Sequence, residues 1–189
     1  MLNWRWIWKT RFVNCACRSV LKKRPTPPRV SDQAPIDSNP AEAFAQAYNR
    51  TLGLIARREH SAAELRRKLA SRGYDDAVTQ RVLEQLQDRG LQNDAVFAEE
   101  YVASKKRRGF GPMKITAELQ QHGISRGQIS ELLAEQDEEW WANCRAAMNR
   151  KYGESVAADQ RDLQRRSRFL QQRGFTASMV AKVIRENSE

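Results

Sequence analysis

The chain has 189 residues, a formal net charge of +10, 40% hydrophobic and 30% charged residues. This composition fits several small cores in a surface-rich protein better than one large globule, and the basic balance favours an anionic partner such as nucleic acid or an acidic protein surface. Three cysteines, Cys15, Cys17 and Cys144, cannot form a disulfide framework and fit a reducing compartment, so we expect a cytoplasmic protein.

Residues 1–38 form a basic head followed by a proline-rich stretch. They hold eight Lys/Arg and only two Asp/Glu residues, together with tryptophans at positions 4, 6 and 8. Charges interrupt the apolar runs, which excludes a signal-peptide core of about 7–15 apolar residues and a membrane span of about 20. The head could lie on an anionic membrane, stack on bases or be a dispensable extension, and we favour the last. The prolines predict an extended linker, so we expect this region to be poorly ordered.

From residue 39 onward every segment has a helical pattern and none has the pattern of a strand. Asn39 and Pro40 are a typical helix start, and Ser61 with Glu64 has the spacing of a capping box. The helix that follows Ser61 ends at Gly73. It carries leucines inward and the cations Arg66 and Arg67 outward.

The stretch from Ser104 to Ile124 places the strongest positive charge at a corner between two helices. Four consecutive cations, Lys105–Arg108, end one helical pattern and complement the negative end of its dipole. A Gly-Phe-Gly break follows, Pro112 opens the next helix, and Lys114 lies in its first turn. Further along, a helix ending at Gly153 is followed by a longer one that carries Arg165 and Arg166.

The helices repeat in groups of three. Gly73, Gly123 and Gly174 are 50 and 51 residues apart, and a leucine stands four residues before each. An apolar residue follows each glycine, a capping residue comes next, and an apolar pair lies nine and ten residues beyond the glycine. Matched columns at nearly constant spacing predict three tandem units.

Such small units must pack on their neighbours, which predicts an all-α protein of three tandem three-helix repeats in an elongated, curved array. We divide the chain into the extension 1–38 and the repeats 39–90, 91–136 and 137–189. Helices about 10–12 Å across give three units a span on the order of 60 Å, which suits a long repetitive target better than a small-molecule pocket.

We expect no catalysis, no cofactor and no metal site. The sequence has no GxxxxGK[ST] loop, no HExxH and no Ser/His/Asp arrangement, and its two histidines, His60 and His122, fall at helix boundaries where we expect polar surface roles. Adjacent carboxylates such as Glu99 and Glu100 diverge around a helix rather than converge.

Specific stretches of all three units resemble the RecX family, regulatory proteins of the RecA recombinase. The first unit contributes ARREHSAAELRRKL (Ala56–Leu69) followed by RGY, the second SKKRRGFGPMKITAELQQHGI (Ser104–Ile124), and the third RKYG and FLQQRGF (Phe169–Phe175). The similarity covers about Ala41 to Glu186 and leaves out the head. The family is built of tandem three-helix repeats.

The resemblance implies a monomeric, non-catalytic inhibitor that binds the RecA–single-stranded DNA filament and limits ATP hydrolysis and strand exchange in recombination, DNA repair and the SOS response. Contact with single-stranded DNA itself would be weak or indirect, and no membrane or small-molecule substrate is implied. The alternative is a direct, sequence-independent DNA-binding protein of helix-turn-helix type. The residues that we expect to contact the partner are cations of all three units: Arg66, Arg67, Lys105, Lys106, Arg107, Arg108, Lys114, Arg165 and Arg166.

Overall fold

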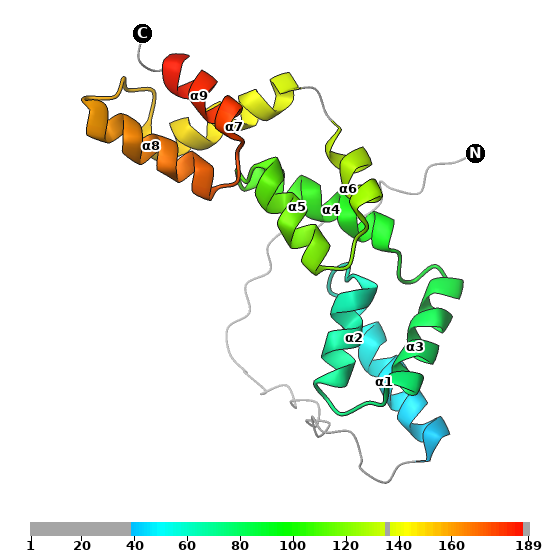
Figure 1. Ribbon diagram of the computed structural model, residues 1–189. Coiled ribbons are helices and arrows are strands. Elements are labelled where there is room, and N and C mark those ends of the chain that lie inside the picture. The colour runs from blue at the N-terminus through cyan, green and yellow to red at the C-terminus, as the bar shows by residue number, and fades with distance from the viewer. Residues whose placement is uncertain (1–38, 135–136, 187–189) are drawn as a thin grey trace, which may run out of the picture. The chain divides into compact units, whose positions relative to one another are not determined.

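The protein is described by a computed structural model covering residues 39–134 and 137–186. Every regular element in these two ranges is an α-helix (Figure 1). In chain order the helices are α1 (Pro40–Ile55), α2 (Ala62–Ala70), α3 (Asp76–Asp88), α4 (Asp94–Arg107), α5 (Pro112–Gln121), α6 (Arg126–Leu133), α7 (Asp137–Tyr152), α8 (Gln160–Gln172) and α9 (Ala177–Glu186). The predicted disorder of 1–38, and the cysteine pair within it, lie outside the described residues.

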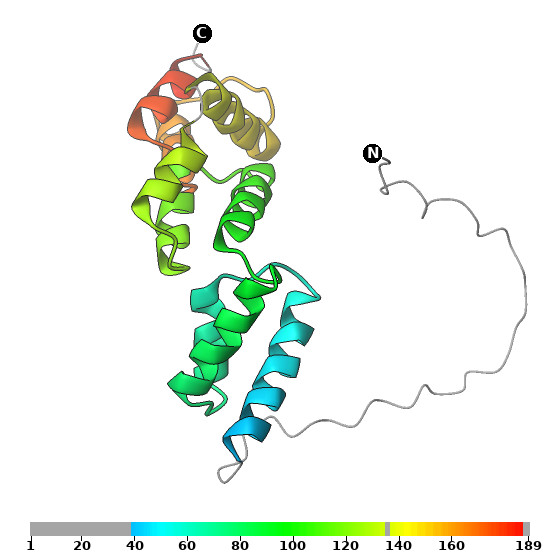
Figure 2. The same cartoon turned by 90° about the vertical axis from the view of Figure 1, so that its right-hand side faces the viewer.

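The helices pack in consecutive triplets. In each triplet the third helix packs on both of the others: α3 on α1 and α2, α6 on α4 and α5, and α9 on α7 and α8 (Figures 1 and 2). The predicted all-α fold of three tandem three-helix repeats is therefore confirmed.

The glycine columns end the second helix of each triplet in the same way. Gly73, Gly123 and Gly174 have φ angles of 81°, 83° and 86°, in the left-handed region that favours glycine. The amide after each glycine donates to the carbonyl of the leucine four residues before that glycine, over 3.3, 3.1 and 3.2 Å in turn. The same three leucines, Leu69, Leu119 and Leu170, are fully buried. Identical backbone turns therefore underlie the sequence repeat.

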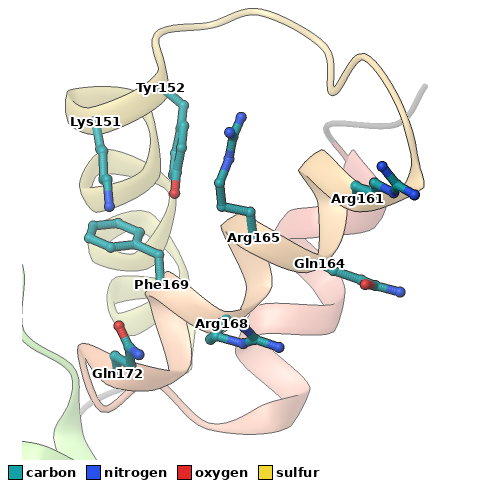
Figure 3. Close-up of a pocket in the computed structure, with 8 residues that line it drawn as sticks. All are labelled: Lys151, Tyr152, Arg161, Gln164, Arg165, Arg168, Phe169 and Gln172. Atoms are coloured by element: carbon teal, nitrogen blue, oxygen red, sulfur yellow. The ribbon is translucent and has the colours of Figure 1, made fainter.

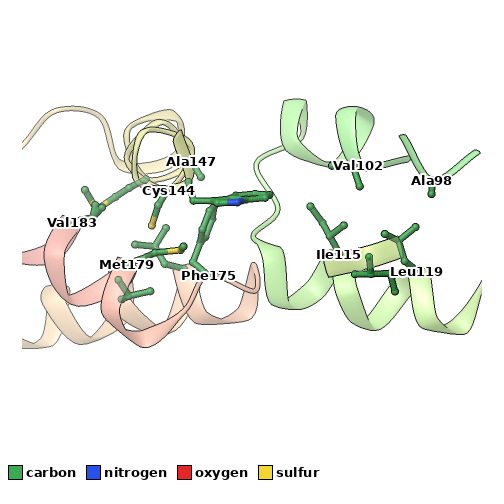
Figure 4. Close-up of a cluster of buried hydrophobic side chains, with 14 of the residues drawn as sticks. Ala98, Val102, Ile115, Leu119, Cys144, Ala147, Phe175, Met179 and Val183 are labelled. Carbon is green, nitrogen blue, oxygen red and sulfur yellow. The ribbon is translucent and has the colours of Figure 1, made fainter. Parts of the chain in front are cut away.

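Two hydrophobic cores hold the triplets together. The first lies within α1–α3 and is built from Ala47, Leu69, Tyr74, Val82 and Leu86. The second is continuous through the second and third triplets (Figure 4). In it, Ile115 and Leu119 of α5 belong to the same cluster as Cys144 of α7 and Val183 of α9. The second and third triplets therefore share one core. Small units need such a shared core, because one unit alone cannot bury enough surface.

Two details differ from the sequence-based predictions. His60 is only 3% exposed, with its Nδ1 3.0 Å from Glu64 Oε2, so it is a buried partner of a carboxylate rather than a surface residue. On α7, steps of three and four residues in the sequence predict that Trp141 shares the inward face with Cys144 and Met148. In the structure that face is centred on Trp140, Cys144 and Met148, and Trp141 is half-buried beside it. Which of two adjacent tryptophans faces the core depends on the docking angle of α7, which local spacing does not fix.

Candidate partner-binding surface

The cation-rich end of α4 is closed by a glycine turn. The amide of Phe110 donates to the carbonyl of Lys105 over 3.1 Å, and that of Gly109 donates to the carbonyl of Lys106 over 2.8 Å. Gly109 has a φ of 74°, so this is a Schellman motif with glycine at its left-handed position. The motif reverses the chain directly after the four cations and places Phe110 among them.

Lys105 turns back onto its own triplet. Its Nζ lies 2.6 Å from Glu118 Oε2 on α5, and the Tyr101 hydroxyl donates to the same oxygen over 2.9 Å. Burial by itself would lower the pKa of Lys105, but the bonds to Glu118 and Tyr101 outweigh it and raise that pKa. The side chain is only 14% exposed, so Lys105 is a charged support of the corner.

Lys106 is held in a similar way by the third triplet. Its Nζ lies 3.7 Å from Glu139 Oε1 and 4.7 Å from the centroid of the Trp140 ring. Its side chain is also 14% exposed. Two of the four cations that the sequence analysis grouped together are therefore used inside the protein.

The remaining two cations, Arg107 and Arg108, are exposed. The guanidinium of Arg108 lies 5.5 Å from the centroid of Phe110, and Lys114 Nζ from α5 lies 4.7 Å from the same centroid. Arg173, at the end of α8, places its guanidinium 5.0 Å away. With Lys105, also at 5.0 Å, four cations from three helices surround one half-buried aromatic ring. We call this surface, with Arg107, the Phe110 corner.

Two arginines of the third triplet complete the corner, although sequence reasoning did not select them. Arg150 donates to the carbonyl of Arg107 over 3.3 Å, and Arg173 donates to that of Arg108 over 2.7 Å. These bonds satisfy carbonyls that the end of α4 leaves without partners inside the helix. The position of Arg173 directly before a repeat glycine, like that of Arg72, is the sequence signal that could have drawn attention to it.

A close contact of two glycine-containing loops fixes the corner. The amide of Gly111 donates to the carbonyl of Arg173 over 2.8 Å, and that of Met113 donates to the carbonyl of Gly174 over 3.0 Å. A Cβ atom on either glycine would overlap the facing chain. Because the backbones touch, Lys114 and Arg173 are brought to the same ring.

The other predicted residues lie elsewhere. Arg66 and Arg67 are exposed on α2, where Arg66 donates to Gln80 Oε1 over 2.7 Å and Arg67 donates to the carbonyl of Gln121 at the end of α5 over 3.2 Å. Arg165 on α8 has a side chain that is 70% exposed and pairs with Asp162 at 2.6 Å. These residues are accessible, but none contributes to the Phe110 corner.

Arg166 has a different environment from its neighbour. It is only 3% exposed, its Nε donates to Asp162 Oδ2 over 3.0 Å, and its Nη1 donates to the carbonyl of Ser155 over 2.7 Å. It therefore supports the connection between α7 and α8 from the inside and is not accessible to a partner at the surface.

Over residues 39–134 and 137–186, no three His, Cys, Asp or Glu side chains form a group that could hold a metal ion. Among the helices of these ranges, none is both long and apolar enough to cross a bilayer.

Comparison with known families gives three adjacent matches along the chain. The models described as the first, second and third three-helix domains of RecX match residues 47–86, 93–133 and 137–184. Regulatory protein RecX of Halorhodospira halophila is 46% identical over 129 residues, which cover 68% of this chain and 80% of that protein. Regulatory protein RecX of Ectopseudomonas mendocina is 37% identical over 134 residues, or 71% and 89% of the two chains.

Two solved structures share the fold. The crystal structure of RecX from Lactobacillus salivarius superposes with a TM-score of 0.64 at 20% identity, covering 78% of this chain and 97% of that one. A second crystal structure, of a regulatory protein RecX, has the same TM-score at 23% identity, covering 78% and 73%.

Proposed function

Because this chain belongs to the RecX family of regulatory proteins, we propose that it binds the RecA filament on single-stranded DNA and limits its ATP hydrolysis and strand exchange. It would act in recombination, DNA repair and the SOS response. In this role it is a monomeric, non-catalytic cytoplasmic protein that needs no cofactor.

The observation that carries this proposal is the Phe110 corner. Arg107 and Arg108 are exposed there, and Lys114 and Arg173 lie within 5.0 Å of the same ring. The Schellman turn and the glycine contact fix the backbone that carries these groups, which reduces the conformational entropy lost on binding. A rigid positive surface around a half-buried aromatic ring suits an acidic protein surface or a phosphate backbone.

The mechanism that we propose is multivalent. Arg66 and Arg67 of the first triplet and Arg165 of the third would add weak contacts to those of the corner. Since all three sets belong to one chain, each contact raises the effective concentration of the next, and avidity exceeds the affinity of any single contact. Bridging adjacent recombinase subunits in this way would hinder the changes that accompany ATP hydrolysis.

Co-sedimentation tests the partner. The full chain is mixed at about 0.15 M salt, where exposed charges are screened beyond about 8 Å, with single-stranded DNA alone or with the same DNA coated with RecA. We expect binding to the filament to be about tenfold tighter or more than binding to bare DNA, because several contacts act together. Equal affinity for both would contradict the proposal and indicate a direct DNA-binding protein of helix-turn-helix type.

A further inference from the structure

A second positive site lies between α7 and α8, next to the Phe110 corner: the guanidinium of Arg173, which belongs to the corner, also lies 5.1 Å from the centroid of Phe169. It is a cavity of about 580 Å³ between the last turn of α7 and the outward face of α8 (Figure 3). Its lining includes four cations and two aromatic rings, together with two glutamines and no carboxylate. We call it the α7/α8 pocket and define it by Lys151, Tyr152, Arg161, Arg165, Arg168 and Phe169.

The three arginines of the pocket all come from α8. Arg161, Arg165 and Arg168 follow one another at steps of four and three, which places them along one side of the helix. Like charges at this spacing destabilise an isolated helix, so their grouping is not explained by the stability of α8. Only Arg165 has a carboxylate partner; within the described ranges, Arg161 and Arg168 form no ion pair. Two of the three guanidinium groups are therefore available to bind an external anion.

The two aromatic rings form the inner wall. Tyr152 and Phe169 meet edge to face, with centroids 5.7 Å apart at an interplanar angle of 84°. The buried guanidinium of Arg166 lies 5.1 Å from the centroid of Tyr152, and its bonds to Asp162 and Ser155 fix its position. Lys151 Nζ lies 4.0 Å from the centroid of Phe169. The rings are thus held in place before any ligand arrives.

This combination distinguishes between anionic ligands. Cations alone suit carboxylates and phosphates equally well. Half-buried aromatic rings next to cations suit a ligand that alternates a phosphate with a planar group, as a nucleic acid strand does. A segment of Asp and Glu residues alone would satisfy the arginines but would offer no planar group to the rings. The volume is also within the range of about 300–1,000 Å³ in which proteins hold small ligands, so one nucleotide fits.

We infer that the α7/α8 pocket binds a phosphate and a base of single-stranded nucleic acid without sequence preference. This inference rests on the proposed function, because the RecA filament supplies the single-stranded DNA. Arg161 and Arg168 hold the phosphates, and Tyr152 and Phe169 contact the base. The third triplet thereby holds the strand while the Phe110 corner remains available to the recombinase.

The charge test uses the full chain and no recombinase. Anisotropy of a labelled oligothymidylate of about 20 nucleotides, longer than a typical site of 4–16, reports affinity as a function of salt. The variant R161E/R168E is compared with R57E/R126E, which changes the net charge equally at two exposed arginines outside the pocket. We expect R161E/R168E to weaken binding about tenfold at low salt and to make the slope of log affinity against log salt shallower by about 1.4, whereas R57E/R126E keeps the slope.

The ring test compares ordinary and abasic strands of the same length. We expect the unmodified protein to prefer the ordinary strand about fivefold or more, and Phe169→Leu, which keeps an apolar side chain in place, to lose most of this preference. Cross-linking of 5-bromodeoxyuridine strands to Tyr152 or Phe169 would support the same assignment. Equal binding of both strands, or equal effects of the two double variants, would overturn it.

The two proposals fail separately. An absence of recombinase binding in co-sedimentation would refute the proposed function. The DNA titrations could still be interpreted, because they contain no recombinase. Conversely, if R161E/R168E bound bare strands as tightly as R57E/R126E, the proposed nucleotide site would be refuted. The assignment of the recombinase as the partner would not be affected.

Discussion

Gly111 and Gly174 bring the start of α5 into backbone contact with the end of α8. The carbonyl oxygen of Gly174 accepts from the amide of Met113, and a Cβ atom on Gly111 would overlap that carbonyl group. Gly111 has a φ of −89°, a value that any residue can adopt. A side chain at this position is therefore excluded by the facing chain and not by the backbone conformation of residue 111. This contact joins the second triplet to the third and positions the Phe110 corner.

Gly111→Ala should destabilise the protein by about 1–3 kcal/mol, because the added methyl group forces two main chains apart. Gly53→Ala is the matched control: it lies within α1 and has no atom within 4 Å of the added Cβ. There we expect a gain of about 0.5–1 kcal/mol from helix propensity. Urea unfolding measures both, and a stability of Gly111→Ala equal to the unmodified protein would contradict the contact.

Arg165 and Arg166 should behave differently despite being neighbours. Arg166→Ala removes a buried guanidinium from Asp162 and from the carbonyl of Ser155, and we expect a loss of about 3 kcal/mol. Arg165→Ala removes a pair whose arginine side chain is 70% exposed, and the loss of stability should be much smaller, because solvent screens the pair. Thermal or urea unfolding compares them, and similar losses for both would mean that Arg166 is not a structural residue.

Glu64 should make stability depend on pH. Burial alone would raise its pKa, but bonds from Arg58 and His60 outweigh burial and lower that pKa from about 4.5 to about 2. A carboxyl group with a depressed pKa stabilises the fold above its unfolded pKa, and this contribution is lost as the pH falls from about 5 to about 2. We expect Glu64→Gln, which removes the charge but keeps the shape of the side chain, to lose about 1 kcal/mol near pH 7 after allowance for solvent screening.

The difference between Glu64→Gln and the unmodified protein should shrink towards zero near pH 2. Unfolding by urea at a series of pH values measures it. Glu99→Gln serves as the control, because Glu99 is exposed on α4 and has no ion pair in the described part of the chain. A difference for Glu64→Gln that grows as the pH falls would contradict the assignment.

Cys144 should be protected from alkylation in the native protein. It is fully buried, and burial raises the pKa of its thiol to about 12, so the reactive thiolate is scarce as well as inaccessible. Iodoacetamide labelling followed by peptide mapping should show slow modification of Cys144 in buffer and rapid modification in urea. Rapid labelling in buffer would mean that the core shared by the second and third triplets opens readily.

The features of the fold that local chemistry determines were predictable from the sequence. The three turns were predictable from Gly73, Gly123 and Gly174, because each turn needs a residue in the left-handed conformation. The leucine four residues before each glycine is buried by the same geometry in each copy. Helix starts such as Ser125, which forms a capping box with Gln128, follow equally local rules.

The environment of individual charges was not predictable in the same way. Lys105 and Lys106 look equivalent to Arg107 in the sequence, yet their partners, Glu118 and Glu139, come from other helices, and tertiary docking selects them. Arg173 reaches the corner only because two glycine-containing loops touch. The candidate surface could therefore be located approximately from the cation run, while its accessible members required the structure.

The most direct test of the proposed interface is the rate of ATP hydrolysis by RecA on single-stranded DNA in the presence of this protein. R107E/R108E reverses the two exposed cations of the Phe110 corner and leaves the internal pairs of Lys105 and Lys106 in place, while R57E/R126E is the charge-matched control. We predict that the unmodified protein and R57E/R126E inhibit hydrolysis alike, and that R107E/R108E needs a concentration about tenfold higher for the same inhibition, with unchanged helicity. Full inhibition by R107E/R108E at the unmodified protein's concentration would contradict the assignment of this corner as the recombinase contact.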